Sequence, residues 1–287
     1  MTALVVAVAV AIPLVGANPH GAAAPMTAGR VHASYQPTDG KLFVLVIGSD
    51  ARSGNPTNVR ADAIHIVGVN TRTLRGGVLN FPRDSWVSIP GHGSGKINEA
   101  LNAGGPELVA QTLESLTGIK LDFWVMTGFE GFQSIVGRLG GVELHLQQDI
   151  HDPGGSGASL QAGKRRLSGV DSLAFVRTRK SFSGGDVTRT TNQGRFLIAM
   201  LRKLRSEVAQ GPAAVLRWHI VGMDNTRMSL TPDEAFRLGV LATQVRPHRV
   251  GNVTVPVSIG SVGAASVVFI SPGGQSIYRR FERTAAL

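Results

Sequence analysis

The sequence predicts an α/β protein in which helices pack against a sheet. Three apolar segments of strand length follow one another closely, at residues 41–48, 62–70 and 76–82. They are rich in β-branched side chains, which strands favour. Helical and strand-like segments then alternate, and the longest helical segment spans residues 187–210. Consecutive strands followed by alternating helices and strands indicate a layered α/β domain.

Charged residues gather at the ends of the first three strands. Residues 71–75 form a turn short enough for an antiparallel return. If the strands run up, down and up, six charged residues share one edge of the sheet. These are Asp50, Arg52, Arg60, Asp62, Arg83 and Asp84. Such an edge suits a divalent cation and a phosphorylated ligand, and the alternative is a solvated edge with ordinary surface ion pairs.

The composition is that of a globular protein with a basic surface. Of the 287 residues 43% are hydrophobic and 17% are charged, so the chain is long and apolar enough for a substantial core. The formal charge of +10 indicates a polyanionic partner: nucleic acid, an anionic membrane or a phosphate-rich polymer. Two Tyr, three Trp and no densely basic helix argue against nucleic acid. The absence of cysteine excludes disulfides and a thiol nucleophile.

The first residues indicate export or membrane anchoring. Residues 3–15 are apolar but fall short of the ~20 residues that a transmembrane helix needs. We interpret residues 1–25 as an apolar leader or truncated anchor and residues 26–40 as a linker, with one domain from 41 to 287. This places the globular part outside the cytoplasm. The alternative is a disordered alanine-rich leader.

The elements expected after the third strand are marked by glycine and proline. Residues 88–95 form a glycine-rich loop before Lys96, which is either a phosphate donor or a solvated lysine. A short helix at 97–103 precedes the break at 104–106. The following elements are a helix at 106–117 ended by Gly118, a strand at 123–126, a helix at 129–139 ended by Gly140 and Gly141, and a strand at 142–146.

A second polar group lies in the following segment. Arg177 and Arg179 follow a short apolar segment, and in an extended chain residues two apart face the same way. Asp186 is expected as the N-cap of the long helix, where Arg189 and Gln193 share one face near the N-terminus, which favours anions. The alternative is a solvated arginine face.

The pair His151 and Asp152 is a candidate for a metal site or a catalytic dyad. Neither residue has a partner at a recognisable spacing in the sequence. The glycine-rich segment 151–157 is therefore expected to be a turn.

The order of the short motifs resembles the LytR-CpsA-Psr family. They are GSD at 48–50, RAD at 60–62, FPRD at 81–84, KIN at 96–98, GGP at 104–106, FEGF at 129–132, LGGV at 139–142, AG at 162–163, LSG at 167–169, AFVRTR at 174–179 and GDVTR at 185–189. The resemblance covers residues 41–210, and residues 225–235 and 253–257 are similar to the end of the family's domain. It implies an α-β-α sandwich with a mixed sheet, outside the cytoplasm on a single N-terminal anchor.

The resemblance also implies a function and roles for the polar residues. Family members transfer a glycopolymer (wall teichoic acid, capsular polysaccharide or arabinogalactan) from a polyprenyl pyrophosphate carrier to peptidoglycan. Mg²⁺ or Mn²⁺ would be held by Asp50 and Asp62. The catalytic residues would be Arg83, Asp84, Arg177 and Arg179, and the pyrophosphate would be bound by Arg60, Lys96, Arg189 and Gln193. The polyprenyl tail would occupy an apolar groove between the sheet and a helix layer. The chain departs from the family at Asn192, where an arginine is common, and in its weak N-terminal anchor.

The mechanism expected from such a site is phosphoryl transfer with polyprenyl phosphate as the leaving group, which depends on positioning and charge stabilisation. Asp84 is the candidate base for a sugar hydroxyl of peptidoglycan. Two other functions remain open. With water as the acceptor the site would be a polyprenyl pyrophosphate hydrolase, and a DNA-binding regulator would need a basic recognition helix that the sequence lacks.

Overall fold

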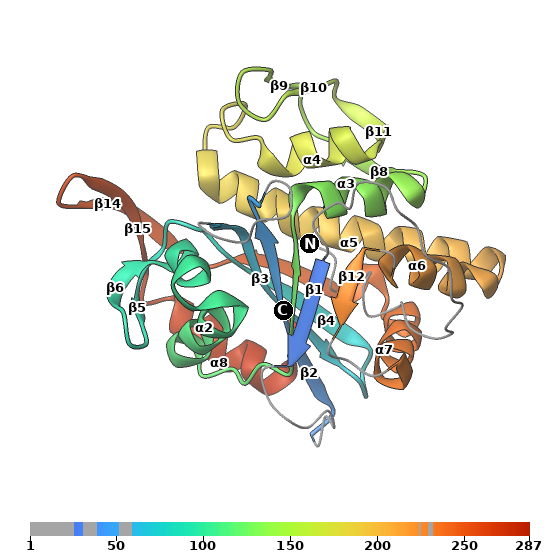
Figure 1. Ribbon diagram of the computed structural model, residues 1–287, viewed down its shortest axis with the longest axis horizontal. Coiled ribbons are helices and arrows are strands. Elements are labelled where there is room, and N and C mark those ends of the chain that lie inside the picture. Colours follow the sequence, from blue (N-terminus) through green and yellow to red (C-terminus); the bar gives the residue numbers. More distant parts are fainter. Residues whose placement is uncertain (1–25, 31–38, 52–58, 224, 229–231) are drawn as a thin grey trace.

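A computed structural model describes residues 26–30, 39–51, 59–223, 225–228 and 232–287. Its centre is a seven-stranded sheet with the strand order β12-β1-β7-β2-β3-β4-β13 (Figure 1). The strands are β1 Met26–Arg30, β2 Lys41–Ser49, β3 Ala61–Asn70, β4 Arg75–Phe81, β7 Phe123–Thr127, β12 Thr226–Met228 and β13 Val250–Thr254. The neighbours β2, β3 and β4 are antiparallel, as the sequence predicts, whereas β7 pairs with β2 and β13 with β4 in parallel. The sheet is therefore mixed.

Helices cover both faces of the sheet, which confirms the three-layer architecture. One face carries α3 Phe129–Arg138, α4 Gly169–Arg177, α5 Gly185–Gln210, α6 Ala213–Met223 and α7 Pro232–Gln244. The other face carries η1 Ile97–Glu99, α2 Ala100–Thr117 and α8 Gly274–Thr284. Figure 1 shows the long α5 crossing the sheet, with α3 and α4 on one side of it.

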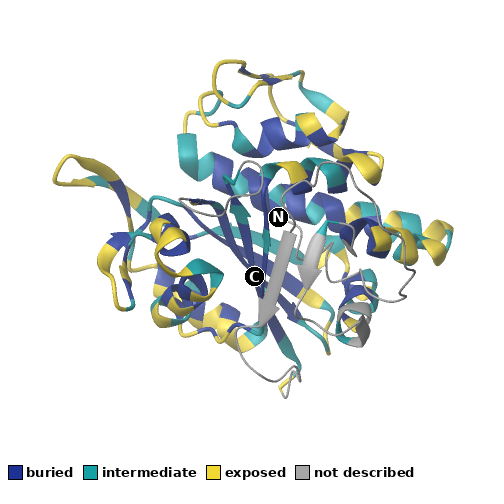
Figure 2. Cartoon of the chain, viewed as in Figure 1, coloured by how far each residue is buried: buried dark blue, intermediate teal, exposed yellow. Residues whose placement is uncertain are grey.

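The side chains of β2 show why the sheet is buried on both sides. Val44 and Val46 belong to the core under α5, and the alternating Leu45 and Ile47 belong to the core under α2 and α8. Strands that are buried on both faces are almost continuously apolar, which explains the run that the sequence shows there. Figure 2 shows the buried residues concentrated in these central strands.

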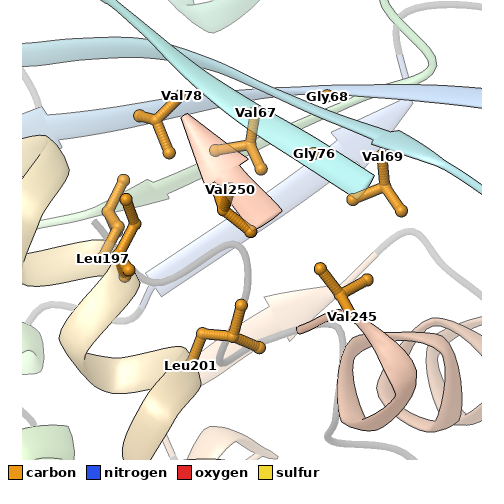
Figure 3. A pocket seen from close by; sticks show the side chains of 10 residues that line it. Val67, Gly68, Val69, Gly76, Val78, Leu197, Leu201, Val245 and Val250 are labelled. Atoms are coloured by element: carbon orange, nitrogen blue, oxygen red, sulfur yellow. The ribbon is translucent and has the colours of Figure 1, made fainter. Parts of the chain in front are cut away.

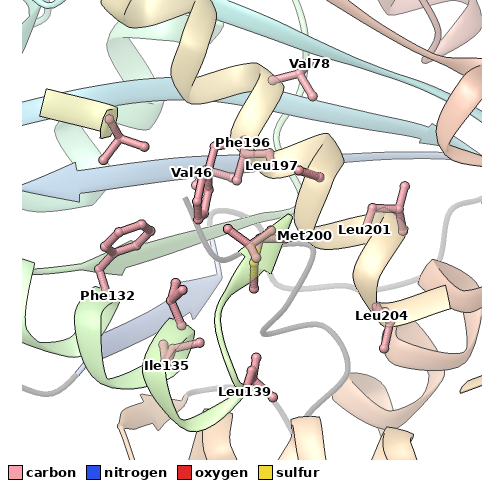
Figure 4. Packing of buried hydrophobic residues seen from close by; sticks show 14 of the residues in the cluster. Val46, Val78, Phe132, Ile135, Leu139, Phe196, Leu197, Met200, Leu201 and Leu204 are labelled. Carbon is pink, nitrogen blue, oxygen red and sulfur yellow. The ribbon is translucent and has the colours of Figure 1, made fainter. Parts of the chain in front are cut away.

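Aromatic and aliphatic side chains join α3 to α5. The rings of Phe132 and Phe196 lie 5.3 Å apart in a tilted arrangement. In Figure 4, Ile135 of α3 and Leu139, which follows α3, face Met200 of α5 across the same core. Each fully buried side chain of this size contributes roughly 1.5–3 kcal/mol, so α5 is anchored firmly at its centre.

On the opposite face, two glycines let α8 approach the sheet closely. A Cβ on Gly68 would lie 2.6 Å from the Phe281 ring, and one on Gly77 would lie 2.8 Å from Leu287. The Phe281 ring packs edge-on against Phe43, with 5.4 Å between the centroids.

The expected helix ends are present. The α2 helix is interrupted at Gly104 and at Gly105, whose φ of 72° is left-handed, and the regular helix resumes at Pro106. Gly118 caps α2 with φ of 74°, and Gly140 and Gly141, which follow α3, both have φ of 78°.

Four two-stranded sheets and one short helix complete the part of the fold that the structure describes. They are β5 Trp86–Ile89 with β6 Gly93–Lys96, β8 Val142–Leu146 with β11 Gly163–Leu167, β9 Ile150–Asp152 with β10 Ala158–Leu160, β14 Val257–Val262 with β15 Ala265–Ile270, and η2 Pro247–Arg249. Residues 88–95, which were expected to form a glycine-rich loop, belong to the hairpin of β5 and β6. Asp152 does hold a turn, since its Oδ2 accepts a hydrogen bond from the Ser156 backbone at 3.2 Å.

Three local predictions from the sequence are wrong. Met26–Arg30, assigned to the linker, pairs with β7 as a strand through backbone hydrogen bonds that its small and polar sequence does not signal. Arg177 ends the helix α4 rather than lying in an extended segment, because Ser168 and Asp171 form a capping box that starts a helix there. The N-cap of α5 is Gly184, so Asp186 lies inside the first turn.

The predicted leader at residues 1–25 and Arg52 lie outside the described residues. Within the described ranges no helix combines the length and the apolar character needed to cross a membrane.

Candidate active site

The ends of β2, β3 and β4 bring charged residues together at one edge of the sheet. The residues there are Asp50, Arg60, Asp62, Arg83 and Asp84. Asp62 owes its position to a β-bulge. The register shifts between the pairs Gly48–Ala63 and Ser49–Ala61, which leaves Asp62 without a partner across the ladder. Bulges of this kind redirect a side chain and are common beside active sites.

Arg83 is the centre of the charge cluster. Its Nη1 lies 2.5 Å from Asp62 Oδ1, and its Nε lies 3.7 Å from Asp186 Oδ1 and 3.8 Å from Asp84 Oδ2. Arg83 therefore links the end of β4 to β3 and to the first turn of α5. All four side chains are only 18–26% exposed, so solvent weakens these ion pairs less than it would at an open surface.

The first turns of α5 supply the next contacts. Arg189 Nη2 lies 2.7 Å from Asp186 Oδ1 and donates to the Asp62 carbonyl at 3.4 Å. Gln193, one turn later, donates from Nε2 to the Asp62 carbonyl at 3.4 Å and to the Val176 carbonyl at 3.0 Å. The predicted placement of Arg189 and Gln193 on one face is therefore correct, and that face meets the bulge in β3.

The remaining predicted residues surround this centre. Lys96 ends β6 and its Nζ lies 3.0 Å from Asp84 Oδ1. Arg177 lies over the Phe129 ring, 4.5 Å from the centroid, and lines a pocket together with Asp62 and Gln193. Arg179 is exposed just after α4 and acts electrostatically on Arg189. The structure thus gathers both predicted polar groups into one site.

Charge and burial oppose each other in the cluster. Burial disfavours the charge on Arg83, but the Asp62 carboxylate, aided by Asp186 and Asp84, raises the pKa of Arg83 overall. Burial lowers the pKa of Arg189, which is 3% exposed, and Asp186 opposes that change. The site holds six cationic side chains and four carboxylates, so positive charge is in excess and suits an anionic ligand.

Asp50 and Asp62 form the candidate metal position. Asp50 Oδ1 accepts the Arg60 backbone N–H at 2.7 Å and Asp62 Oδ1 contacts Arg83, so the second oxygen of each carboxylate has no partner among the described residues. Among all the residues that the structure describes, no group of three or more His, Asp or Glu side chains is placed to hold a metal ion. Mg²⁺ commonly takes one or two carboxylates and completes its shell with phosphate oxygens and water, so this donor pair fits it.

A buried polar network, formed by His65, Asn80 and Asn252, lies between the sheet and α5. His65 Nδ1 lies 2.8 Å from Asn80 Oδ1, and Asn80 Nδ2 donates to Asn252 Oδ1 at 2.8 Å. Asn80 accepts through its oxygen, so His65 carries its proton on Nδ1. Burial lowers the pKa of His65 to about 3. Gly194 makes room for the network, since a Cβ there would lie 2.0 Å from Asn252 Oδ1.

An apolar pocket adjoins the charged residues. Beside Asp62, Arg177 and Gln193 it is lined by Phe129, Phe132, Leu173 and Val176 from the helix layer. A second apolar pocket lies further along the same interface, where Val67 and Val78 of the sheet face Leu197 and Leu201 of α5 and Val245 follows α7 (Figure 3). Both pockets lie between the sheet and the helix layer, and the first of them adjoins the charge cluster.

Two contributions escaped the sequence analysis. Asp186 belongs to the site, and its i, i+3 spacing to Arg189 was the available signal. The His65 network combines residues far apart in the chain and leaves no local pattern. Asn192, the departure from the family pattern, points away from the cluster, because its Oδ1 accepts from Arg195 Nη1 at 3.2 Å on the neighbouring face of α5.

Comparison with known proteins agrees with this geometry. The sequence profile of the LytR_cpsA_psr family matches residues 17–275. Probable cell wall biosynthesis protein LcpB of Corynebacterium glutamicum is 35% identical over 55% of this chain and 40% of its own length. Polyisoprenyl-teichoic acid–peptidoglycan teichoic acid transferase TagT of Bacillus subtilis is 34% identical over 60% of this chain and 55% of its own length. The chain thus spans about half the length of these two relatives.

A longer match and the solved structures complete the comparison. Regulatory protein MsrR of Staphylococcus aureus is 30% identical over 79% of this chain and 69% of its own length. The structure of TagT bound to LI-WTA superposes with a TM-score of 0.73 at 26% identity, covering 88% of this chain and 94% of that one. A TagT structure with bound octaprenyl pyrophosphate lipid gives a TM-score of 0.69 at 24% identity, covering 88% of this chain and 93% of that one. The chain therefore belongs to the LytR-CpsA-Psr family.

Proposed function

We propose that this protein transfers a glycopolymer from a polyprenyl pyrophosphate carrier to a sugar hydroxyl of peptidoglycan. The observation that supports this proposal best is the junction of the charge cluster with an apolar pocket at Asp62, Arg177 and Gln193. A pyrophosphate with a polyprenyl tail has the same two parts. The names of the relatives LcpB and TagT agree with a role in cell-wall assembly.

Each part of the substrate has a matching surface. Arg60, Arg83, Arg177, Arg179 and Arg189 can donate forked hydrogen bonds to phosphate oxygens, and Lys96 adds a compact charge. The tail would extend from the pocket beside Phe129 and Phe132 along the interface between the sheet and α5. That pocket holds about 30 Å³, so the tail must displace side chains of α3 and α4 as it enters.

Asp50 and Asp62 would hold Mg²⁺ or Mn²⁺. When bound, the ion would neutralise charge on the pyrophosphate and on the leaving phosphate. Arg83 keeps Asp62 in place through its contact with Oδ1, and the Arg60 backbone orients Asp50.

The proposed step is a phosphoryl transfer that balances without a further reactant. The acceptor oxygen bonds to the phosphorus that carries the glycopolymer, the P–O bond to the lipid phosphate breaks, and polyprenyl phosphate leaves. Asp84 is the proposed base for the hydroxyl proton, and Lys96, 3.0 Å from its Oδ1, positions it. Arg83 and Arg189 stabilise the charge that grows on the phosphoryl oxygens.

The proposal places the chain in the cell envelope, outside the cytoplasm, where a lipid-linked polymer and peptidoglycan meet. The polymer would be of the arabinogalactan, teichoic acid or capsular type. If water replaces the sugar hydroxyl, the same site hydrolyses the pyrophosphate, so hydrolysis is the alternative activity of this site.

The test follows polyprenyl phosphate release from a short-chain polyprenyl pyrophosphate glycolipid by the purified chain, with Mg²⁺ and with EDTA. We expect metal-dependent release that falls at least about a hundredfold in Arg83→Ala, the range for losing one transition-state contact. Arg165→Ala is the matched control, because the Arg165 side chain is exposed on β11 and hydrogen-bonds to Gln161, away from the charge cluster.

Release by folded Arg83→Ala at the rate of Arg165→Ala would refute the assignment of the site. Release that yields only free glycan phosphate, even with a peptidoglycan acceptor present, would favour the hydrolase.

A further inference from the structure

Another cavity, distinct from the two apolar pockets, lies beside α5 on a different face from the charge cluster. It holds about 150 Å³ between α5, the strands β8 and β9, and the segment that joins α4 to α5. The polar side chains that line it are Gln147, Gln148, Ser183, Thr188, Asn192 and Arg195. None of these six residues belongs to the charge cluster or lines the apolar pocket beside it.

The periodicity of α5 relates the cavity to the active site. Thr188, Asn192 and Arg195 recur at i, i+4 and i+7 and so form one stripe along the helix. Arg189 and Gln193 follow the neighbouring stripe, about 100° around the axis, and meet Asp62. One rigid helix therefore presents two polar stripes, one to each site.

The segment 178–184 also connects the two sites. Arg179 follows α4 at the charge cluster, whereas Phe182 and Ser183 line the cavity. Gln148 Nε2 donates to the Ser181 carbonyl at 2.7 Å, and Ser181 Oγ donates to the His151 carbonyl at 2.9 Å. These bonds fasten the segment between α4 and α5 to β9 and to the residues that precede it.

The cavity contains hydrogen-bonding groups that the described protein leaves unused. Asn192 is 3% exposed and its Oδ1 accepts from Arg195, but its Nδ2 has no partner among the described residues. The hydroxyls of Thr188 and Ser183 and the Nε of Arg195 likewise make no hydrogen bond within the described structure. Asn192 Nδ2 is not one of the fully buried polar atoms that lack a partner, so it can donate a hydrogen bond to a polar molecule in the cavity.

The chemistry of the lining selects the class of ligand. The polar lining is one guanidinium, three amides and two hydroxyls with no carboxylate, which suits neither a metal ion nor a pyrophosphate. Phe182, half-buried, and Phe175, buried, add aromatic faces. The volume lies below the roughly 300 Å³ of the smallest drug-sized pockets, which limits the occupant to about one ring. Many neutral hydrogen bonds around an apolar face fit a sugar residue.

We propose that this cavity is a carbohydrate subsite that binds one sugar residue of a glycan strand while the pyrophosphate occupies the neighbouring stripe of α5. The inference rests on the proposed function for the source of the glycan, which is either the acceptor strand or the donor polymer. Binding energy from a sugar remote from the reacting phosphorus would orient the two substrates.

The test is calorimetric titration of the full chain, without lipid or pyrophosphate, with two soluble probes. One probe is the N-acetylglucosamine–N-acetylmuramic acid disaccharide of the acceptor, and the other is an arabinan oligosaccharide of the donor type. We expect one probe to bind with millimolar affinity. Thr188→Val and Arg195→Met should each weaken it roughly tenfold, the effect of one lost hydrogen bond. The control is Arg202→Met, an exposed arginine two turns further along α5.

The outcomes separate this inference from the proposed function. Arg83→Ala should bind the glycan as the unmodified chain does, whatever its cleavage activity. Thr188→Val preserves side-chain shape, so it remains informative if Arg195→Met fails to fold. Absence of binding by both probes at tens of millimolar would overturn the subsite, as would equal affinity in the unmodified chain and in folded Thr188→Val.

Discussion

His65 makes the stability of the domain depend on pH in a way that the structure quantifies. The ring is fully buried, its Nδ1 proton is used by Asn80, and its pKa falls from 6.5 to about 3 because burial disfavours the charged form. Between these two values the unfolded chain binds the proton and the folded chain does not. Stability must therefore fall as the pH drops through this window.

The magnitude follows from the same two pKa values. At pH 5 the unfolded histidine is about 97% protonated, which costs about 2 kcal/mol of folding free energy relative to pH 7. The variant His65→Asn keeps a donor near the Nδ1 position and removes the titration. We expect its stability deficit against the unmodified chain to shrink by about 2 kcal/mol between pH 7 and pH 5.

Urea unfolding of both proteins at several pH values measures this difference. His219, whose pKa burial lowers to about 4, shifts stability in the same direction but cancels in the comparison. A deficit that is the same at pH 5 and pH 7 would refute the assignment of His65 as a buried neutral base.

Three substitutions test the packing and the charges around this network. Gly194→Ala should lower the free energy of unfolding by roughly 1–3 kcal/mol, because the added Cβ would clash with Asn252. This clash outweighs the preference of alanine for helices. In the same thermal unfolding assay the control Gly137→Ala, which has open space around the added Cβ, should be neutral or stabilising. Arg83→Lys should recover little of the activity lost in Arg83→Ala, since one ammonium cannot reproduce the guanidinium contacts with both Asp62 and Asp186, and steady-state release of polyprenyl phosphate measures this. Asp186→Asn should lower that release at least about tenfold because Arg83 and Arg189 lose a shared partner; unchanged turnover would show that Asp186 is dispensable.

The strands and the helix ends could be predicted because the residues within each segment determine them. The nearly continuous apolar run of β2, which is buried on both faces, and the left-handed glycine after α2 leave clear patterns in the chain. The convergence of charges was predictable from strand direction alone, which places Asp50, Asp62 and Arg83 at one edge.

The predictions that fail concern segments whose conformation is decided by contacts with other parts of the fold. The strand β1 is held by pairing with β7, and nothing in its five residues favours a strand over a linker. The short apolar segment before Arg177 favours an extended chain, but the capping box formed by Ser168 and Asp171 starts a helix there. The bulge that exposes Asp62 depends on the register between two strands, which the sequence of either strand alone does not determine.

The most direct test of the proposed transfer is to follow a phosphorus label from donor to acceptor. The donor would be a polyprenyl pyrophosphate glycolipid labelled at the phosphorus next to the sugar, incubated with the full chain, Mg²⁺ and peptidoglycan glycan strands. Transfer predicts that the label appears in a phosphodiester on the glycan strand, in amounts equal to the polyprenyl phosphate released. Label that remains in the lipid fraction, with the protein folded and Mg²⁺ present, would contradict the proposed activity.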